Sequence, residues 1–220
     1  MTLAREGYPF VAAGLLLAGA FWVGVWTGVG GAVVTAGAWV LTALAIFVTW
    51  FFRDPEPSLP DDDALVVAPG QGKVILVDDV DEPTFVGGPA RKISIFLSVF
   101  DVHVQRAPVG GTVRYKEYKP GRYAVAWLDK ASDDNEQASL GIETPNGRVL
   151  VRQIAGLVAR RIITDPSEGD VVHRGHRFGL IRFGSRVDLF VPRHWDVRCA
   201  VGDRVRVGSS VIASQRPETP

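Results

Sequence analysis

The run from Gly7 to Phe52, in which no residue is charged, limits how this chain can fold more than any other feature. A helix needs about 20 apolar residues to cross roughly 30 Å of hydrocarbon, and this run is about twice that long. The sequence TGVGG, from Thr27 to Gly31, lies near its middle and favours a turn. The run therefore predicts an N-terminal hydrophobic helical hairpin that spans a membrane or is deeply embedded in it.

Two alternatives to a spanning hairpin are a secretory signal peptide and a shallow re-entrant hairpin. A signal peptide has a much shorter apolar core, whereas this run is long and leads directly into Arg53, Asp54 and Pro55. The re-entrant hairpin stays open as an alternative. Because a hairpin returns both ends to one side, Arg5 and Arg53 favour the cytoplasm for both. We expect a cell-membrane protein whose remaining domain lies in the cytoplasm.

The sequence after the hairpin changes to a pattern typical of β-strands. Proline and acidic residues make 53–63 a linker, so the expected domains are 1–52, 53–63 and 64–220. From there the apolar period is two, and Gly and Pro separate short segments, which predicts a mainly β, antiparallel sandwich or barrel-like body. The segment Ala155 to Ile163 stays open between strand and short helix. The predicted strands are Leu65 to Ala68, Lys73 to Val77, Ile93 to Val99, Thr112 to Tyr118, Tyr123 to Leu128, Leu140 to Glu143, Arg148 to Ile154, Phe178 to Phe183, Val187 to Val191 and Asp203 to Val207.

One pattern occurs twice, as GDVVHRG from Gly169 to Gly175 and as GDRVRVG from Gly202 to Gly208. Both copies predict a tight turn entering a strand, and they resemble the hairpins of biotinyl and lipoyl carrier domains. A carrier displays a lysine near such a turn, and neither copy has one. We interpret the repeat as scaffold that places two similar hairpins around the strand containing Ser185.

Charge and composition exclude several classes of function. Lys and Arg together number 24, as do Asp and Glu, so no net positive charge favours a nucleic acid. The single cysteine, Cys199, cannot form an internal disulfide. His173 and His176 lie three residues apart without further ligands nearby, and we expect no metal site.

The segment Gly175 to Pro192 has a serine on an apolar strand face. Counting by twos from Ile181 places Val187 and Ser185 on the same face, with Gly184 just before the serine. A buried hydroxyl without a partner costs about 1–3 kcal/mol, so this serine needs a partner or a task. If the Gly-Ser peptide is strained, Oγ can attack the preceding carbonyl and convert the peptide into an ester. A bulge with a hydrogen-bonded serine is the alternative that the pattern alone also allows.

Several separated motifs resemble the short bacterial form of the phosphatidylserine decarboxylase family. They are REGYPF, FFRDPEP (Phe51 to Pro57), RKISIFLSVFDVHVQRAPVGG (Arg91 to Gly111), DKASDDNEQ (Asp129 to Gln137), QIAGLVARRI (Gln153 to Ile162) and the segment around Gly184-Ser185. The resemblance implies self-cleavage between Gly184 and Ser185, giving a large chain 1–184 and a small chain 185–220. Ser185 would become a pyruvoyl group, a cofactor made from the chain itself, so no external cofactor or metal is expected.

The same resemblance implies a decarboxylase that converts phosphatidylserine to phosphatidylethanolamine. The pyruvoyl carbonyl would form a Schiff base with the substrate amine and act as the electron sink. His103, in FDVHVQR, would be the proton donor or base, although spacing alone also allows a structural histidine. Arg106, Arg182 and Arg186 are candidate partners for the substrate anions. The expected partners are the phospholipid membrane, phosphatidylserine, the two chains of one precursor and, as an option, a second copy in a homodimer.

Two positions depart from the resembled pattern. Gln71 stands where the family usually has an aspartate, and Arg106 stands where long relatives have a second histidine. Glutamine cannot act as a base, so Asp101 or another acid would have to replace the aspartate. Two other functions therefore stay open: a relative that binds phospholipid without self-processing, and a membrane-tethered structural or adaptor module. The segment Asp129 to Gln137 is expected to be a lid or docking loop.

Overall fold

The computed structural model describes residues 2–121, 135–156, 161–182 and 184–217. The chain divides into two compact units, Met1–Glu56 and Pro57–Pro220. The predicted strand Tyr123 to Leu128 and most of the predicted loop Asp129 to Gln137 lie outside the described residues.

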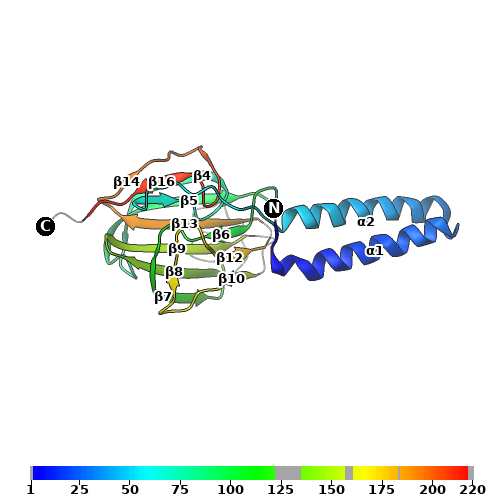
Figure 1. Cartoon of the computed structure of the whole chain (residues 1–220), viewed down its shortest axis with the longest axis horizontal. Helices are drawn as coiled ribbons and strands as arrows, with labels where there is room; N and C mark the ends of the chain where they lie inside the picture. The colour runs from blue at the N-terminus through cyan, green and yellow to red at the C-terminus, as the bar shows by residue number, and fades with distance from the viewer. Residues whose placement is uncertain (1, 122–134, 157–160, 183, 218–220) are drawn as a thin grey trace. The chain divides into compact units, whose positions relative to one another are not determined.

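The first unit is a hairpin of two apolar helices, which confirms the predicted helical hairpin (Figure 1). Helix α1 (Tyr8–Trp26) follows a short 3₁₀ turn, η1 (Arg5–Gly7), and helix α2 is Gly31–Phe51. Both helices are long and apolar enough to cross a membrane. The tight turn between them is built on Gly28 and Gly30, whose φ angles of 75° and 80° favour glycine.

Polar groups within the hairpin are paired inside it. Trp22 Nε1 donates to Thr42 Oγ1 at 3.0 Å, which joins the two helices. The Thr42 hydroxyl in turn donates to the carbonyl of Ala38 within its own helix. Strands β1 (Thr2–Leu3) and β2 (Arg53–Asp54) pair antiparallel at the open end. The hairpin can therefore enter an apolar medium with these groups satisfied.

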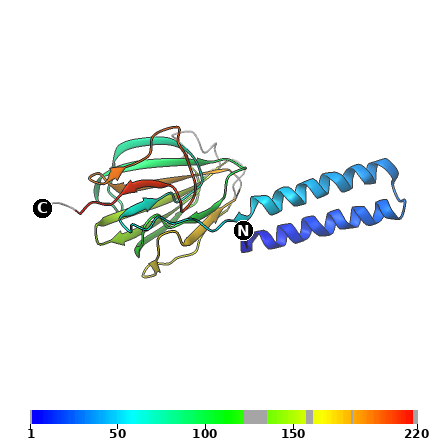
Figure 2. The same ribbon diagram turned by 45° about the horizontal axis from the view of Figure 1, so that its top comes forward.

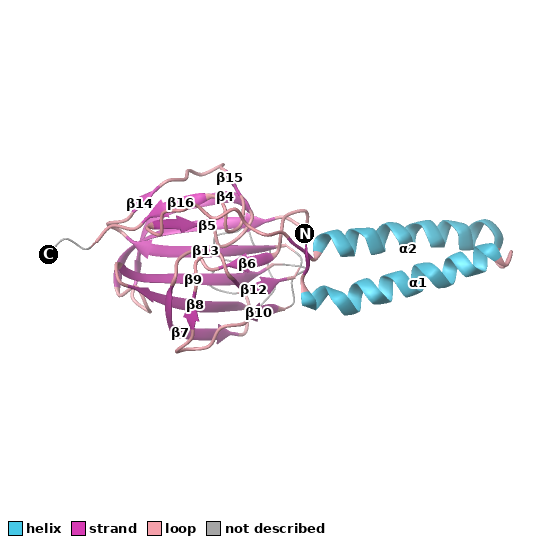
Figure 3. Ribbon diagram, in the orientation of Figure 1, coloured by secondary structure: helices cyan, strands magenta, loops and turns pink. Residues whose placement is uncertain are grey.

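The second unit is a β body with one large antiparallel sheet that curls, as Figure 2 shows from a second side. The sheet has eight strands in the order β11-β7-β8-β9-β13-β5-β4-β15, and two three-stranded sheets have the orders β10-β12-β6 and β14-β16-β3. In Figure 3, β9 and β13 run through the middle of the large sheet. The strands are β3 (Leu65–Val67), β4 (Gly72–Glu82), β5 (Gly88–Leu97), β6 (Val104–Arg106), β7 (Gly111–Lys119), β8 (Gln137–Thr144), β9 (Gly147–Ala155), β10 (Ile162–Thr164), β11 (Val171–Val172), β12 (Arg177–Ile181), β13 (Ser185–Pro192), β14 (Asp196–Val197), β15 (Arg204–Val205) and β16 (Val211–Ser214). The mainly β, antiparallel prediction is confirmed.

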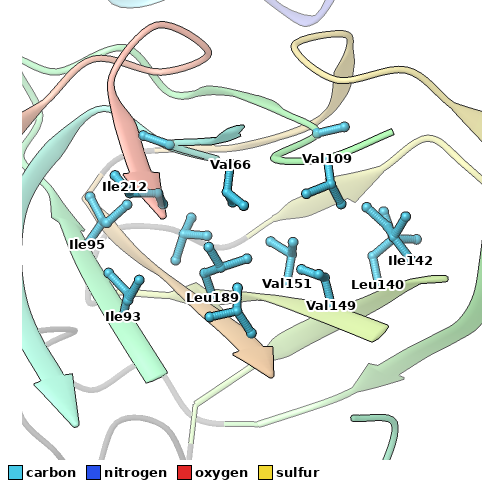
Figure 4. Close-up of a cluster of buried hydrophobic side chains, with 14 of the residues drawn as sticks. Val66, Ile93, Ile95, Val109, Leu140, Ile142, Val149, Val151, Leu189 and Ile212 are labelled. Atoms are coloured by element: carbon cyan, nitrogen blue, oxygen red, sulfur yellow. The ribbon is translucent and has the colours of Figure 1, made fainter. Parts of the chain in front are cut away.

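The main core fills the space on the concave side of the large sheet. Figure 4 shows Leu189 of β13 and Val151 of β9 packed with Ile93 and Ile95 of β5, below Val66 and Ile212 of the small sheet β14-β16-β3. Alternate residues of β13 therefore enter this core, as the period of two predicted.

The segment around Gly184 differs from the single strand considered above. Strand β12 ends at Ile181 and belongs to a small sheet, whereas β13 begins at Ser185 in the large sheet. The chain thus leaves one sheet and enters another at the Gly184-Ser185 peptide. In the segment left open above, β9 ends at Ala155 and β10 begins at Ile162, with residues 157–160 outside the description. Arg53 and Asp54, assigned above to the linker, form β2.

The repeated G-D-x-V-x-x-G pattern reflects an internal two-fold relation. Its copies contribute β11 and β15, which form the two opposite edges of the large sheet. Their backbone bonds match: Val113 N donates to Asp170 O, and Val74 N donates to Asp203 O. The relation extends to the small sheets, because the β6–β12 and β3–β16 pairs have the same register shift at the same place.

The two-fold relation divides the β body into two halves of similar topology. One half is continuous and contains β6 to β12, while the other combines β3 to β5 with β13 to β16. The continuous half is therefore inserted into the other between Leu97, which ends β5, and Ser185, which begins β13. In the continuous half, the corresponding strands β8 and β9 are joined by a simple hairpin. The Gly184-Ser185 peptide is where the chain returns from the insertion.

Candidate active site

Ser185 is fully buried at the start of β13, between two neighbouring strands of the large sheet. It lies opposite Leu97 of β5 and opposite Ala155 of β9. Its hydroxyl has no hydrogen-bond partner among the described residues. A buried serine hydroxyl without a partner costs about 1–3 kcal/mol, and an unpartnered Oγ is free to act as a nucleophile.

The residue before it, Gly184, has a φ of 65°, in the left-handed region that favours glycine. A Cβ at this position would meet no atom within 4 Å, so the preference comes from the backbone angle and not from crowding. Gly184 N donates to His103 Nε2 at 3.2 Å. The Gly-Ser peptide thus follows a left-handed residue whose own backbone N–H donates to the imidazole.

His103 is fully buried in the segment between β5 and β6, and each of its two ring nitrogens contacts a polar backbone atom. Nδ1 lies 3.0 Å from the backbone carbonyl oxygen of Asp101, while Nε2 accepts from Gly184 N. A carbonyl can only accept, so Nδ1 carries the proton and Nε2 presents a lone pair. This neutral tautomer turns an unprotonated imidazole nitrogen toward Gly184.

The Asp101 carboxylate does not hold the imidazole; it closes the loop that carries it. Oδ2 accepts from Ser98 N at 2.9 Å and from Ser98 Oγ at 2.7 Å. Arg204 Nη1 lies 3.8 Å from Oδ1. Asp101 therefore fixes the turn from Ser98, and its backbone carbonyl then sets the position of His103.

A buried amide network that the sequence pattern did not reveal lies next to these residues. Gln153 Nε2 donates to Gln105 Oε1, and the Thr164 hydroxyl donates to Gln153 Oε1. Gln153 Nε2 also contacts the carbonyl oxygen of Ile163 at 3.2 Å. Both glutamine side chains are fully buried. The one signal in the sequence was that Gln105 lies two residues after His103 in FDVHVQR.

The three arginines proposed from the sequence lie in different surroundings. Arg186 is buried on the face of β13 opposite Ser185, where Nη2 donates to Asp188 Oδ2 at 2.9 Å. Arg106 Nη1 donates to the carbonyl of Gly175, within the first repeat turn. Arg182 is half-buried, two residues before Gly184. Arg186 directly follows Ser185 in the chain, although its side chain lies on the other face of β13.

Gln71 precedes β4 and is half-buried. The neighbouring Gly70 lies close to the core, because a Cβ there would be 3.4 Å from Leu97 and 3.5 Å from Val187. Leu97 is the residue opposite Ser185, so this loop lies near the serine. An amide, and not a carboxylate, therefore occupies this side of the site.

The remaining histidines lie on the surface. The rings of His173 and His176 are in edge contact at 5.1 Å, and His194 Nε2 lies 3.1 Å from the carbonyl oxygen of Arg216. Within residues 2–121, 135–156, 161–182 and 184–217, no group of three metal-ligating side chains occurs.

The last part of DKASDDNEQ is structural. Asn135 is fully buried and donates from Nδ2 to the carbonyl of Ala155 at 2.8 Å, which holds the end of β9 beside Ser185. Glu136 accepts from Tyr118 Oη. These contacts tie the start of β8 to the sheet.

The matches found by comparison with known proteins have the same family description. The model of the phosphatidylserine decarboxylase family matches residues 44–213. Proteins named phosphatidylserine decarboxylase proenzyme from Symbiobacterium thermophilum and Salinibacter ruber are 52% and 46% identical to this chain over 96% and 90% of its length. A protein of the same name from Syntrophus aciditrophicus is 43% identical over 96%. The alignments cover 94%, 86% and 97% of these relatives. Together with the buried Gly184-Ser185 peptide, these matches show that the chain belongs to the phosphatidylserine decarboxylase family.

Proposed function

We propose that this chain is the precursor of a phosphatidylserine decarboxylase that cleaves itself between Gly184 and Ser185. The observation that carries the proposal is the buried, unpartnered Ser185 hydroxyl next to a left-handed Gly184, with His103 Nε2 3.2 Å from Gly184 N. Family membership supplies the substrate class, the head group of phosphatidylserine, and the product, phosphatidylethanolamine.

In self-cleavage, Ser185 Oγ attacks the Gly184 carbonyl carbon, and His103 Nε2 accepts the hydroxyl proton. The bond from Gly184 C to Ser185 N then breaks, and the peptide becomes an ester. β-Elimination releases Gly184 as a carboxylate and leaves a dehydroalanine at position 185. Addition of water and loss of ammonia give a pyruvoyl group at the start of the small chain 185–220.

The residues present fit such a group. A pyruvoyl carbonyl supplies the electron sink that decarboxylation of an amino acid requires. His103 would take up and return a proton next to it at Nε2, the nitrogen that has no proton when Nδ1 carries one. Arg182 is the arginine we assign to the substrate anions. Its place in the chain, two residues before Gly184, supports this assignment. Arg106 Nη1 donates to the carbonyl oxygen of Gly175, and Arg186 Nη2 donates to Asp188 Oδ2.

The hairpin of α1 and α2 associates the enzyme with the membrane that contains its substrate. We propose that it spans this membrane and leaves residues 57–220 in the cytoplasm, because Arg5 and Arg53 flank the two outer ends of the run. Since a hairpin returns both ends to one side, both ends of the run would lie on the cytoplasmic side.

The test is the intact mass of the purified protein under denaturing conditions, beside a Ser185→Ala variant. We expect two chains that meet between Gly184 and Ser185 in the wild type, with the small chain lighter by the change from serine to pyruvoyl. The Ser185→Ala variant should remain a single chain. A single chain in both samples would contradict the decarboxylase and favour a phospholipid-binding relative without self-processing.

A further inference from the structure

The two halves of the β body differ at the buried amide network. In the continuous half the network consists of Gln105 in β6, Gln153 in β9 and Thr164 in β10. The strand registers place a valine at each equivalent position of the other half: Val66 for Gln105, Val191 for Gln153 and Val197 for Thr164. Val66 and Val191 are fully buried in the core. The fold therefore accepts valines at these places, and burial of polar groups there costs free energy that the fold does not require.

The hydrogen bonds determine how the amides are oriented. Gln153 must direct Oε1 to the Thr164 hydroxyl and Nε2 to the carbonyl of Ile163, because a carbonyl cannot donate. Because Gln153 Nε2 is a donor, the atom of Gln105 that accepts its hydrogen bond must be Oε1. The NH₂ group of Gln105 is fully buried, and it has no hydrogen-bond partner among the described residues.

The unused NH₂ group lies at the end of the core that contains Ser185. Gln105 lies two residues after His103 in the chain, and His103 Nε2 accepts from Gly184 N at 3.2 Å. Gln153, to which Gln105 is bonded, lies opposite Val187 of β13. The next pair along these strands on the same face is Ala155 with Ser185. The equivalent valines Val66 and Val191 belong to the other end of the sheet.

We propose that the Gln105 amide donates a hydrogen bond to the Gly184 carbonyl oxygen as that oxygen becomes negatively charged during self-cleavage. The inference rests on the proposed function and assigns the group that stabilises its first step. As the bond from Ser185 Oγ to Gly184 C forms, the hydroxyl proton goes to His103 and the electron pair of the carbonyl moves to its oxygen. When the tetrahedral carbon collapses, the bond from Gly184 C to Ser185 N breaks, and the nitrogen takes up a proton. Gln153 and Thr164 position the donor.

A neutral amide suits this task in a buried site. It stabilises developing negative charge without titrating and without leaving a buried cation next to His103. The donor is already oriented by Gln153, so little reorganisation is needed when the charge forms. The cost of keeping an unpaired NH₂ group buried in the precursor is recovered in the transition state.

The experiment replaces the amides by the residues that the other half uses. In Gln105→Val/Gln153→Val, we expect self-cleavage of the full-length precursor to slow by about 100-fold or more. The matched control is Gln137→Val, because Gln137 is a buried glutamine on the opposite face of the large sheet; it should cleave at the wild-type rate. Gln105→Asn keeps an amide donor and should cleave within about tenfold of the wild type, as expected for a slightly displaced hydrogen bond. Cleavage is followed by the mass of the 185–220 fragment over time after synthesis.

Two further measurements separate the proposed role from a structural one. In the Ser185→Ala background, Gln105→Val/Gln153→Val should leave the temperature of thermal unfolding unchanged or raise it, because the fold uses valines at the equivalent positions. Neutral hydroxylamine cleaves esters, so it should release the fragment from the wild-type precursor but not from the double variant, in which the ester does not form.

Three outcomes would overturn the inference: wild-type cleavage in the double variant, equal slowing in Gln105→Asn, or hydroxylamine release from the double variant at the wild-type rate. If the wild-type precursor itself stayed intact, the proposed function would fail, and this inference with it. Normal wild-type cleavage with normal double-variant cleavage would contradict the inference alone.

Discussion

Glu82 fixes the turn between β4 and β5 through its buried carboxylate. Oε2 accepts from Phe85 N at 2.9 Å and Val86 N at 2.8 Å, and Oε1 accepts from Thr84 N. Burial acts to raise the pKa of Glu82, but these backbone donors outweigh it and hold the pKa below its usual 4.5. Phe85, held by this turn, covers Gly141 of β8, where a Cβ would lie 2.7 Å from its ring.

The stability from Glu82 should therefore depend on pH. Because its pKa is lower in the folded chain than in the unfolded chain, this stability is present above pH 4.5 and is lost as pH falls through the folded pKa. Glu82→Gln should lower the free energy of unfolding by about 1–3 kcal/mol at pH 7 and by less in acid. Denaturant unfolding of the β body at several pH values measures this. An equal loss at all pH values would contradict it.

At the residue scale, the sequence predicted Ser185 and His103 but not the amides. The motif V-H-V-Q-R reads as a strand with one apolar and one polar face, yet Val102, His103, Val104 and Gln105 are all buried. The alternation of apolar and polar residues along a strand identifies the buried face only when the other face is exposed to solvent. The network also needs Gln153, which reaches Gln105 only through the pairing of distant strands.

At the scale of elements, the loop from Ser98 to His103 should control self-cleavage. Asp101 closes the loop through two hydrogen bonds to Ser98, and its carbonyl sets the imidazole tautomer. Asp101→Ala should therefore slow cleavage by about tenfold, since a loss of about 1.4 kcal/mol in positioning corresponds to that factor.

The control for the loop is Asp81→Ala, which removes an exposed carboxylate from β4. It should leave the rate of cleavage unchanged. The rate is measured by the appearance of the fragment 185–220, together with thermal unfolding of each variant in the Ser185→Ala background. Asp101→Ala that cleaves as fast as the wild type would show that the loop needs no closure by this carboxylate.

The strands themselves were predictable wherever one face met the core. The alternation of Val187, Leu189 and Val191 identified β13, and the uncharged run identified the hairpin of α1 and α2. The break between Ile181 and Ser185 was not predictable, because β12 and β13 continue the same apolar alternation in different sheets. Only the insertion of one half into the other, a property of the whole topology, explains why the chain breaks there.

At the scale of the whole molecule, the position of β13 determines what self-cleavage can release. The small chain would begin with β13, which is paired on one side with β5 and on the other with β9. It would also contain β14, β15 and β16, which pair among themselves and with β3 and β4 of the large chain. Cleavage after Gly184 would cut the backbone between β12 and β13, which belong to different sheets.

We therefore expect the two chains to remain associated after cleavage. Val187, Leu189 and Val191 are fully buried, and each contributes about 1.5–3 kcal/mol to holding the small chain, in addition to the strand pairing. In size-exclusion chromatography in mild detergent, the small chain should elute with the large chain and separate from it only in concentrated denaturant. The Ser185→Ala precursor, which has one continuous chain, gives the reference elution volume. Release of the small chain in native buffer would contradict this expectation, because it would mean that strand pairing and burial of β13 are too weak to replace the broken peptide.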